Sequence, residues 1–173
     1  MSDVGVALVP GSFDPIHNGH IEIIERASVH FDEVLVAAIR NPQKDTALFT
    51  LEEREAMILE ALSHLSNIRI GHFKGLLVDY CRDQGVTAIV KGLRTISDFE
   101  YEMAQAQMNR AVGGIDTLFI PAGPQTSFLA SKLVREVARF GADVAEMVPP
   151  AVATRLKERF ADGPFGAGTV AEP

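Results

Sequence analysis

An apolar run, Val4-Gly5-Val6-Ala7-Leu8-Val9, leads into the segment Pro10-Gly11-Ser12-Phe13-Asp14-Pro15-Ile16-His17-Asn18-Gly19-His20. The run is typical of a buried strand, and the apolar pattern that resumes at Ile21, Ile23 and Ile24 is typical of a helix. Glycine and proline between the two indicate a tight strand-to-helix turn. His20 is therefore expected in or near the first turn of that helix.

The same alternation of strand and helix continues along the chain. Four more apolar runs predict strands, each followed by a helix-like stretch: Glu33–Ile39, Ile68–Phe73, Thr87–Val90 and Thr117–Ile120. Strands that alternate with helices form a parallel sheet covered by helices. We predict one α/β domain over residues 1–160, with a doubly wound sheet of about five parallel strands. The stretch 161–173, rich in glycine, alanine and proline, is predicted to be a flexible tail.

Capping residues mark the expected ends of the helices. Thr50-Leu51-Glu52-Glu53 and Ser97-Asp98-Phe99-Glu100 both have the capping-box pattern, in which a hydroxyl and a carboxylate pair with backbone amides at a helix start. We expect these helices to run to about His64 and Arg110. Gly85 and the pair Gly113-Gly114 stand where helices should stop.

Charge and composition limit the class of partner. The formal net charge is −7, and nonspecific nucleic-acid binding needs a basic face, so no nucleic-acid partner is expected. The mean hydropathy of +0.12 is that of a soluble globular protein. The sequence has neither a signal-peptide pattern nor an apolar run long enough for a bilayer, which predicts a cytoplasmic protein with no membrane partner. Cys81, the one cysteine, suits a reducing compartment and is interpreted as a small core residue on a helix.

Most of the unusual polar residues follow the predicted strands. In parallel sheets ligands bind beyond the carboxyl ends of the strands, where the strand order reverses. The segments expected to converge there are Pro10–His20, Arg40–Phe49, Lys74–Leu77, Lys91–Ser97 and Pro121–Lys132.

The first of these segments predicts a phosphate-binding site. Amides at a helix start are unpaired and the helix dipole is positive there, so an anion near Gly19 and His20 is stabilised. The imidazole of His20 and the hydroxyl of Ser12 add donors. The alternative is a tight turn with His17 and His20 as exposed polar residues. No P-loop pattern occurs, which disfavours a conventional P-loop site.

Two groups of motifs carry a resemblance to known families. The strings Pro10 to Pro15 and His17-Asn18-Gly19-His20 resemble the signature of the nucleotidyltransferase superfamily, with its His-x-Gly-His motif. A more specific likeness, to the bacterial phosphopantetheine adenylyltransferases, lies in Lys91-Gly92-Leu93-Arg94, Asp98-Phe99-Glu100-Tyr101-Glu102-Met103 and Gln107-Met108-Asn109-Arg110. The resemblance implies a Rossmann-like fold and transfer of the adenylyl group of ATP to 4'-phosphopantetheine, giving dephospho-coenzyme A and pyrophosphate.

The resemblance also implies roles for individual residues. It makes His20 the transition-state stabiliser and assigns contacts with 4'-phosphopantetheine to Ser12, Lys44, Leu77 and Lys91. The implied ATP contacts are Ser12, Phe13, His20, Gly92, Leu93, Arg94, Glu102, Thr126, Ser127, Phe128, Leu129, Ala130, Ser131 and Lys132. The acceptor phosphate is already anionic near neutral pH, so the reaction needs alignment and charge stabilisation rather than a general base.

The sequence departs from the family pattern in two places. Lys91 stands where the family frequently has arginine, which replaces a fork of donors by a point charge. Ala130-Ser131-Lys132 stands where the family commonly has three serines, which removes two hydroxyls and adds a cation. Backbone amides at a helix start survive these changes, so phosphate binding is still expected.

The resemblance further implies Mg²⁺ carried with ATP, no metal held by protein side chains, a homohexamer and feedback by coenzyme A. Two other hypotheses remain open. One is a sister nucleotidyltransferase acting on nicotinamide mononucleotide or another phosphate acceptor. The other is a noncatalytic adenine-nucleotide sensor, to which Ala130 and Lys132 lend support.

Overall fold

A five-stranded parallel sheet forms the centre of the protein. The computed structural model describes residues 5–39 and 47–161. The strands are β1 (Val6–Gly11), β2 (Glu33–Ile39), β3 (Ile68–Phe73), β4 (Val86–Leu93) and β5 (Asp116–Pro121). They lie in the order β3-β2-β1-β4-β5, and all neighbours are parallel. The predicted Rossmann-like doubly wound sheet is confirmed.

The strand order reverses between β1 and β4. From β1 the chain moves outward through β2 to β3, and then returns to the other side of β1 to form β4 and β5. β1 therefore pairs with β2 along its whole length, from Val6 opposite Glu33 to Gly11 opposite Ala38, and with β4 on its other side. The carboxyl ends of β1 and β4 flank the point at which such sheets bind ligands.

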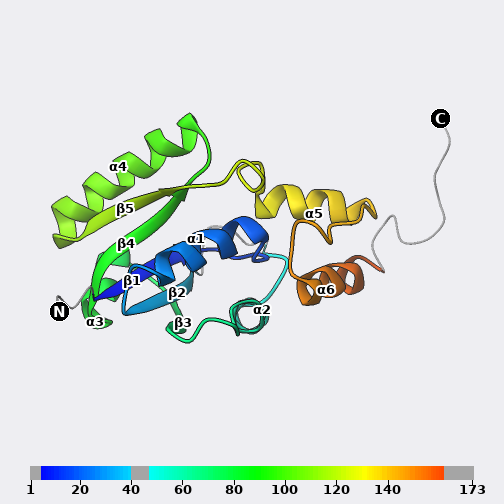
Figure 1. The fold of residues 1–173 in the computed structure, drawn as a ribbon, viewed down its shortest axis with the longest axis horizontal. Helices are drawn as coiled ribbons and strands as arrows, with labels where there is room; N and C mark the ends of the chain where they lie inside the picture. Colours follow the sequence, from blue (N-terminus) through cyan, green and yellow to red (C-terminus); the bar gives the residue numbers. More distant parts are fainter. Residues whose placement is uncertain (1–4, 40–46, 162–173) are drawn as a thin grey trace.

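Helices cover both faces of this sheet (Figure 1). They are α1 (Asn18–Ser28), α2 (Leu51–Ala61), α3 (Leu77–Asp83), α4 (Ile96–Gly113), α5 (Ser131–Arg139) and α6 (Pro150–Phe160). Alternate residues of each strand face opposite sides, which produces two apolar clusters. Ala7 and Val9 of β1 pack towards α1, α2, α5 and α6, whereas Leu8 packs towards α3, where Cys81 is buried as predicted.

One predicted capping box is confirmed and the other is wrong. At α2 the Thr50 hydroxyl accepts the Glu53 N–H at 3.2 Å, and the Glu53 carboxylate accepts the Thr50 N–H at 2.7 Å. At α4 the cap is Thr95 rather than Ser97, because the Thr95 hydroxyl accepts the Asp98 N–H at 3.2 Å. The Thr-x-x-Asp pattern two residues earlier thus starts the helix in place of Ser97.

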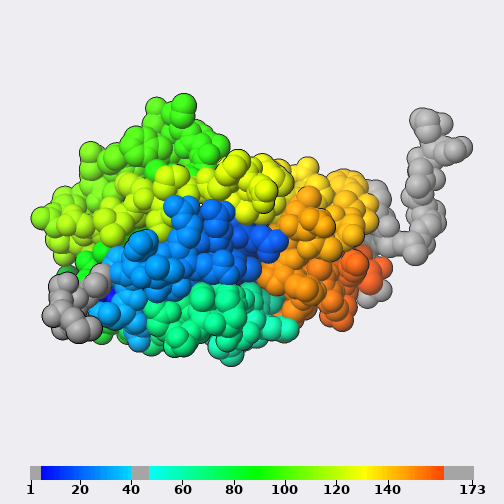
Figure 2. Space-filling view, in the orientation of Figure 1, coloured from blue at the N-terminus to red at the C-terminus, as the bar shows by residue number. Residues whose placement is uncertain are grey.

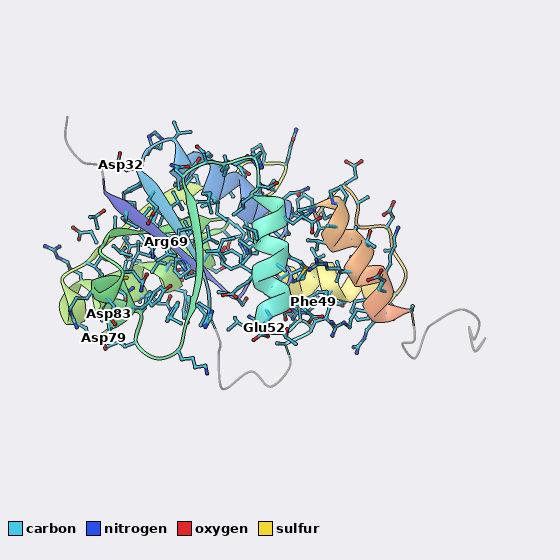
Figure 3. The ribbon with its side chains drawn as sticks, turned by 90° about the horizontal axis from the view of Figure 1, so that it is seen from below. Asp32, Phe49, Glu52, Arg69, Asp79 and Asp83 are labelled. Carbon is cyan, nitrogen blue, oxygen red and sulfur yellow. The ribbon has the colours of Figure 1, made fainter. Side chains whose placement is uncertain are left out.

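The element ends differ from the prediction by a few residues. β4 extends to Leu93, so Lys91, Gly92 and Leu93 belong to the strand itself rather than to the loop after it. α4 ends at Gly113, and Gly114 is its left-handed cap with φ of 70°. On the edge strand β3, Arg69 pairs with Glu33 at 2.8 Å and places a charge along that edge (Figure 3).

The described part of the chain has no helix that is both long and apolar enough to cross a bilayer. Of the predicted tail, 161–173, all residues after Ala161 lie outside the described residues.

Candidate active site

His17 and His20 form a reciprocal capping box at the start of α1. The His17 N–H donates to Nδ1 of His20 at 3.2 Å, and the His20 N–H faces Nδ1 of His17 at 3.4 Å. The two rings stack with their centroids 3.6 Å apart, and the edge of Phe13 completes the group at 4.9 Å from His20. The interpretation of His17 as an exposed polar residue is wrong, since it is 4% exposed.

These bonds select one tautomer of each imidazole. A backbone N–H can only donate, so Nδ1 of His20 is an acceptor and the ring proton of the neutral form lies on Nε2. Burial, followed by the charges of His17, Arg94 and Lys91, holds the pKa of His20 well below 6.5. Burial and Arg94 lower the pKa of His17 to about 4. At neutral pH His20 is thus a neutral donor through Nε2–H, placed among positive charges.

Few amides at the start of α1 are open to an anion, which corrects the expectation of unpaired donors there. The Asn18 N–H donates to the Met147 carbonyl oxygen at 2.9 Å, and the His20 N–H donates to the His17 carbonyl oxygen at 2.9 Å. Among the first three helical residues only Gly19 has an N–H without an acceptor in the described residues. The cause is His17, whose carbonyl and side chain both serve the first turn.

Two buried charged side chains hold the turn between β1 and α1. Asp14, which is 5% exposed, accepts the N–H groups of Leu48 and Phe49, each at 2.9 Å. Arg54, which is 6% exposed, donates to the carbonyl oxygens of Ser12 at 2.8 Å and Ile39 at 3.2 Å. The Ser12 residue itself is exposed, while the ring of Phe13 is buried against His20.

A second group of predicted residues lines a small recess between β4 and the helices α3 and α4. Leu77, Lys91 and Glu102 all border this recess of about 20 Å³, together with Asn109 and Thr117. Lys91 and Glu102 form an ion pair at 3.2 Å, with side chains 23% and 18% exposed. The Thr117 hydroxyl is buried there without a hydrogen-bond partner among the residues that the structure describes. The predicted acceptor contacts Leu77 and Lys91 therefore share one recess, whereas Lys44 lies outside the described residues.

The predicted ATP segment 126–132 leads into α5. Its N-cap is Ala130, which makes no side-chain capping bond, and the N–H groups of Ser131, Lys132 and Leu133 have no acceptor in the part of the chain that is described. The Ser131 hydroxyl is used elsewhere, donating to the Pro15 carbonyl oxygen at 2.9 Å. Open amides for an anion are thus found at α5 rather than at α1.

Arg94 joins this segment to the end of β4. Its guanidinium donates to the Leu129 carbonyl oxygen at 2.8 Å and pairs with Asp98 at 2.8 Å. Leu129 is buried and Phe128 is 62% exposed, so the two apolar residues of the segment differ in access to a ligand. Arg94 thus joins the segments after β4 and β5, and the bond from Ser131 to Pro15 joins the segment after β1 to them at the switch point.

Sequence reasoning missed several residues that shape this site. Asp14 lies within the motif yet acts through backbone amides 34 and 35 residues away, which no local pattern reveals. His17 had a usable signal, because a side-chain acceptor three residues before His20 is a capping pattern. Three others have no local signal: Arg54, Arg135, which pairs with Asp14 at 3.1 Å, and Glu22, which accepts the Gly123 N–H at 2.9 Å.

The comparisons with known proteins agree with the motifs. Residues 8–137 match the cytidylyltransferase-like family. A phosphopantetheine adenylyltransferase of Corynebacterium diphtheriae is 48% identical over 153 residues, which cover 88% of this chain and 96% of that protein. The chain belongs to the phosphopantetheine adenylyltransferase family.

Solved structures support the fold alone. A protein described as a nicotinate-nucleotide adenylyltransferase from Vibrio parahaemolyticus superposes with a TM-score of 0.62 at 18% identity, covering 87% of this chain and 97% of that one. A bifunctional NMN adenylyltransferase/ADP ribose pyrophosphatase from Francisella tularensis gives 0.63 at 15% identity, covering 91% and 51%. The Rossmann-like arrangement is thus shared, and these likenesses do not decide the acceptor.

The lowered pKa of His17 predicts an acid-sensitive stability. Between pH 6.5 and about 4 the unfolded chain takes up a proton at His17 that the folded chain resists, so stability present above pH 6.5 is lost as the pH falls. Between pH 7 and pH 4.5 the free energy of unfolding of the parent chain is expected to fall by about 2 kcal/mol more than that of His17→Asn, a variant that keeps a capping side chain. Urea unfolding at the two pH values measures this difference, and equal losses in both proteins would contradict it.

Proposed function

We infer that this chain transfers the adenylyl group of ATP to 4'-phosphopantetheine, giving dephospho-coenzyme A and pyrophosphate. The observation that carries this function is the 48% identity, over 88% of the chain, to a phosphopantetheine adenylyltransferase. The geometry around His20 fits the chemistry, because a neutral donor lies among positive charges at the switch point of the sheet.

The reaction we propose is a direct in-line displacement. An oxygen of the acceptor phosphate forms a bond to the α-phosphorus of ATP, the bond from that phosphorus to the bridging oxygen breaks, and pyrophosphate leaves with the electron pair. The acceptor is already anionic, so the protein supplies position and charge rather than a base. Nε2–H of His20 donates to an α-phosphoryl oxygen as charge develops there.

We propose the following division of the site. The acceptor is held by Ser12, Lys44, Leu77 and Lys91. ATP is held by Ser12, Phe13, His20, Gly92, Leu93, Arg94, Glu102, Thr126, Ser127, Phe128, Leu129, Ala130, Ser131 and Lys132. The open amides at the start of α5 support a place for the β- and γ-phosphates there.

Two features of the site bear on the roles of individual residues. The ion pair between Lys91 and Glu102 means that an incoming phosphate shares the lysine with a carboxylate. The cation of Lys132, exposed in the first turn of α5, stands where the family commonly has a serine.

We propose that ATP reacts as its Mg²⁺ complex, the metal shielding the triphosphate charge. Within the described residues no group of three or more histidine, cysteine, aspartate and glutamate side chains is placed to hold a metal ion. The residues proposed to contact ATP would bind that complex.

The proposed assembly is a homohexamer, with coenzyme A as a feedback ligand of the same site and the cytoplasm as the compartment. Support for assembly comes from α4, an 18-residue helix with no buried residue. Tyr101, Met108 and Val112, each more than half exposed, follow one another at spacings of seven and four residues and so lie on one face of this helix. Such a contiguous apolar face is typical of a surface that a protein partner covers.

Pyrophosphate release with ATP and each of two acceptors tests the function. We expect release with 4'-phosphopantetheine and at least 10²-fold less, by order of magnitude, with nicotinamide mononucleotide. Release only with the nicotinamide nucleotide would instead establish the sister transferase. Stabilisation by ATP without release for either acceptor would establish the nucleotide sensor.

A further inference from the structure

The side chain of Glu22 ties α1 to the segment that follows β5. Glu22 lies two residues after His20 on the same helix. Its Oε1 accepts the Gly123 N–H at 2.9 Å, and its Oε2 accepts the hydroxyl of Thr126. The carboxylate is 26% exposed, so both bonds are partly shielded from water. One side chain thus binds a backbone amide and a hydroxyl of the proposed ATP segment.

The segment is shaped to receive this carboxylate. A Cβ on Gly123 would lie 3.0 Å from Oε1 and 3.2 Å from Oε2 of Glu22, so the close approach depends on glycine. The Gly123 carbonyl oxygen accepts two backbone bonds, from the Thr126 N–H at 3.1 Å and from the Ser127 N–H at 2.9 Å. These bonds fold residues 123–127 into a compact turn. Both ends of this turn therefore meet the same carboxylate.

Apart from Glu22, the turn has few attachments to the rest of the protein. The Ala122 N–H, just before the turn, donates to the Leu93 carbonyl oxygen at the end of β4 at 2.8 Å. Arg26, one helical turn after Glu22, donates to the Pro121 carbonyl oxygen. Further along, Arg94 holds the carbonyl oxygen of Leu129. Between these points the segment has no buried side chain, since Leu129 is its first buried residue. Figure 2 shows the segment, in yellow, lying against α1, in blue. Polar bonds rather than apolar packing fix the turn.

We propose that Glu22 is a positioning residue for ATP: it holds the segment 123–127 on the helix that carries His20. The proposal rests on the proposed function insofar as this segment binds ATP. The Thr126 hydroxyl is engaged by Glu22, so Thr126 contributes by fixing the backbone of the segment. Without Glu22 the segment must be ordered when ATP binds, and that ordering lowers the apparent affinity. A partly exposed turn with no buried side chain adds little to global stability.

The test compares Glu22→Ala with Glu25→Ala, one helical turn apart in the same helix. Glu25 pairs with His64 at 2.8 Å and has no recorded contact with the segment 121–131, so it controls for loss of an acidic side chain from α1. Calorimetric titration with MgATP, without acceptor, is expected to give a Kd about tenfold higher for Glu22→Ala, by the usual size of two lost hydrogen bonds. Glu25→Ala is expected to bind as the parent chain does.

Three further variants separate positioning from folding. Glu22→Gln keeps an oxygen for the Gly123 N–H and is expected to recover part of the lost affinity. Thr126→Val should weaken binding. The Glu22→Ala/Thr126→Val double variant should lose less affinity than the sum of the two single losses, because both changes remove the bond between Glu22 and the Thr126 hydroxyl. Fully additive losses, or a parent-like Kd for Glu22→Ala, would overturn the proposal. So would a loss of affinity matched by a large fall in Tm.

These outcomes are independent of the acceptor. If the parent chain binds ATP yet releases no pyrophosphate with 4'-phosphopantetheine, the proposed function fails while the Kd comparison still decides the role of Glu22. At saturating ATP, turnover of Glu22→Ala is expected to stay within about threefold of the parent. The main effect of the substitution should be a higher KM for ATP. A fall in kcat alone would contradict a positioning role in ATP binding.

Discussion

Replacing His20 by alanine is expected to lower turnover by about 10²-fold or more while leaving the Kd for ATP largely unchanged. The reason is that Nε2–H of His20 is a donor at neutral pH, since Nδ1 accepts the His17 N–H and the pKa of the ring is held well below 6.5. A donor whose hydrogen bond strengthens as charge develops on the phosphoryl oxygen stabilises the transition state more than the bound substrate. A 10²-fold loss of turnover corresponds to about 2.7 kcal/mol of this stabilisation. Steady-state pyrophosphate release and ATP titration measure the two quantities separately.

Two controls distinguish catalysis from damage to the helix start. The His20→Gln variant can still accept the His17 N–H, as glutamine does at this position of a capping box, so its folding should stay close to that of the parent. His72→Ala removes an exposed histidine paired with Glu55 at 2.6 Å on the edge strand, and should leave turnover unchanged. Parent-like turnover in His20→Ala would exclude the transition-state role. The glutamine amide can also donate a hydrogen bond, so the comparison uses stability: an unfolding free energy of His20→Ala well below that of His20→Gln would assign the loss of turnover to the cap.

The fold was predictable because its signals are local and repeated. Each strand is a short apolar run, and each is followed by a helical pattern. This alternation of strands and helices is enough to predict the doubly wound sheet. The error at α4 shows the limit of such signals. Thr95 and Ser97 both begin a hydroxyl-x-x-acid pattern, and only the three-dimensional path of the chain after β4 selects Thr95.

The candidate site was predictable in its motifs and less so in its supports. His20 was found through the His-x-Gly-His string, whereas Glu22 meets Gly123 and Thr126 across about a hundred residues of sequence. The sequence also could not predict which helix start has unpaired backbone amides. Whether a helix start is free depends on distant carbonyls, such as that of Met147, which closes the Asn18 N–H at α1.

The largest loss of stability is expected from Asp14→Ala. The Asp14 carboxylate is 5% exposed and accepts the N–H groups of Leu48 and Phe49, and it also pairs with Arg135 at 3.1 Å. Alanine would leave the two amides without their acceptor and would remove the carboxylate that pairs with Arg135, whose guanidinium keeps only the backbone carbonyl oxygen of residue 14. Removing one partner of such a buried set costs about 3 kcal/mol or more. The midpoint and slope of urea unfolding measure this free energy at pH 7.

Asp32 provides the matched control for this loss. It is an exposed aspartate at the opposite end of the sheet that accepts one backbone N–H, from Gly5, at 3.0 Å (Figure 3). Asp32→Ala should cost less than about 1 kcal/mol, because water can replace an exposed acceptor. Asp14→Asn should fall between the two, since one carbonyl oxygen can serve only one of the two amides well. If Asp14→Ala were as mild as Asp32→Ala, the turn between β1 and α1 would owe its shape to Arg54 and apolar packing, and the buried carboxylate would have to be explained by catalysis instead.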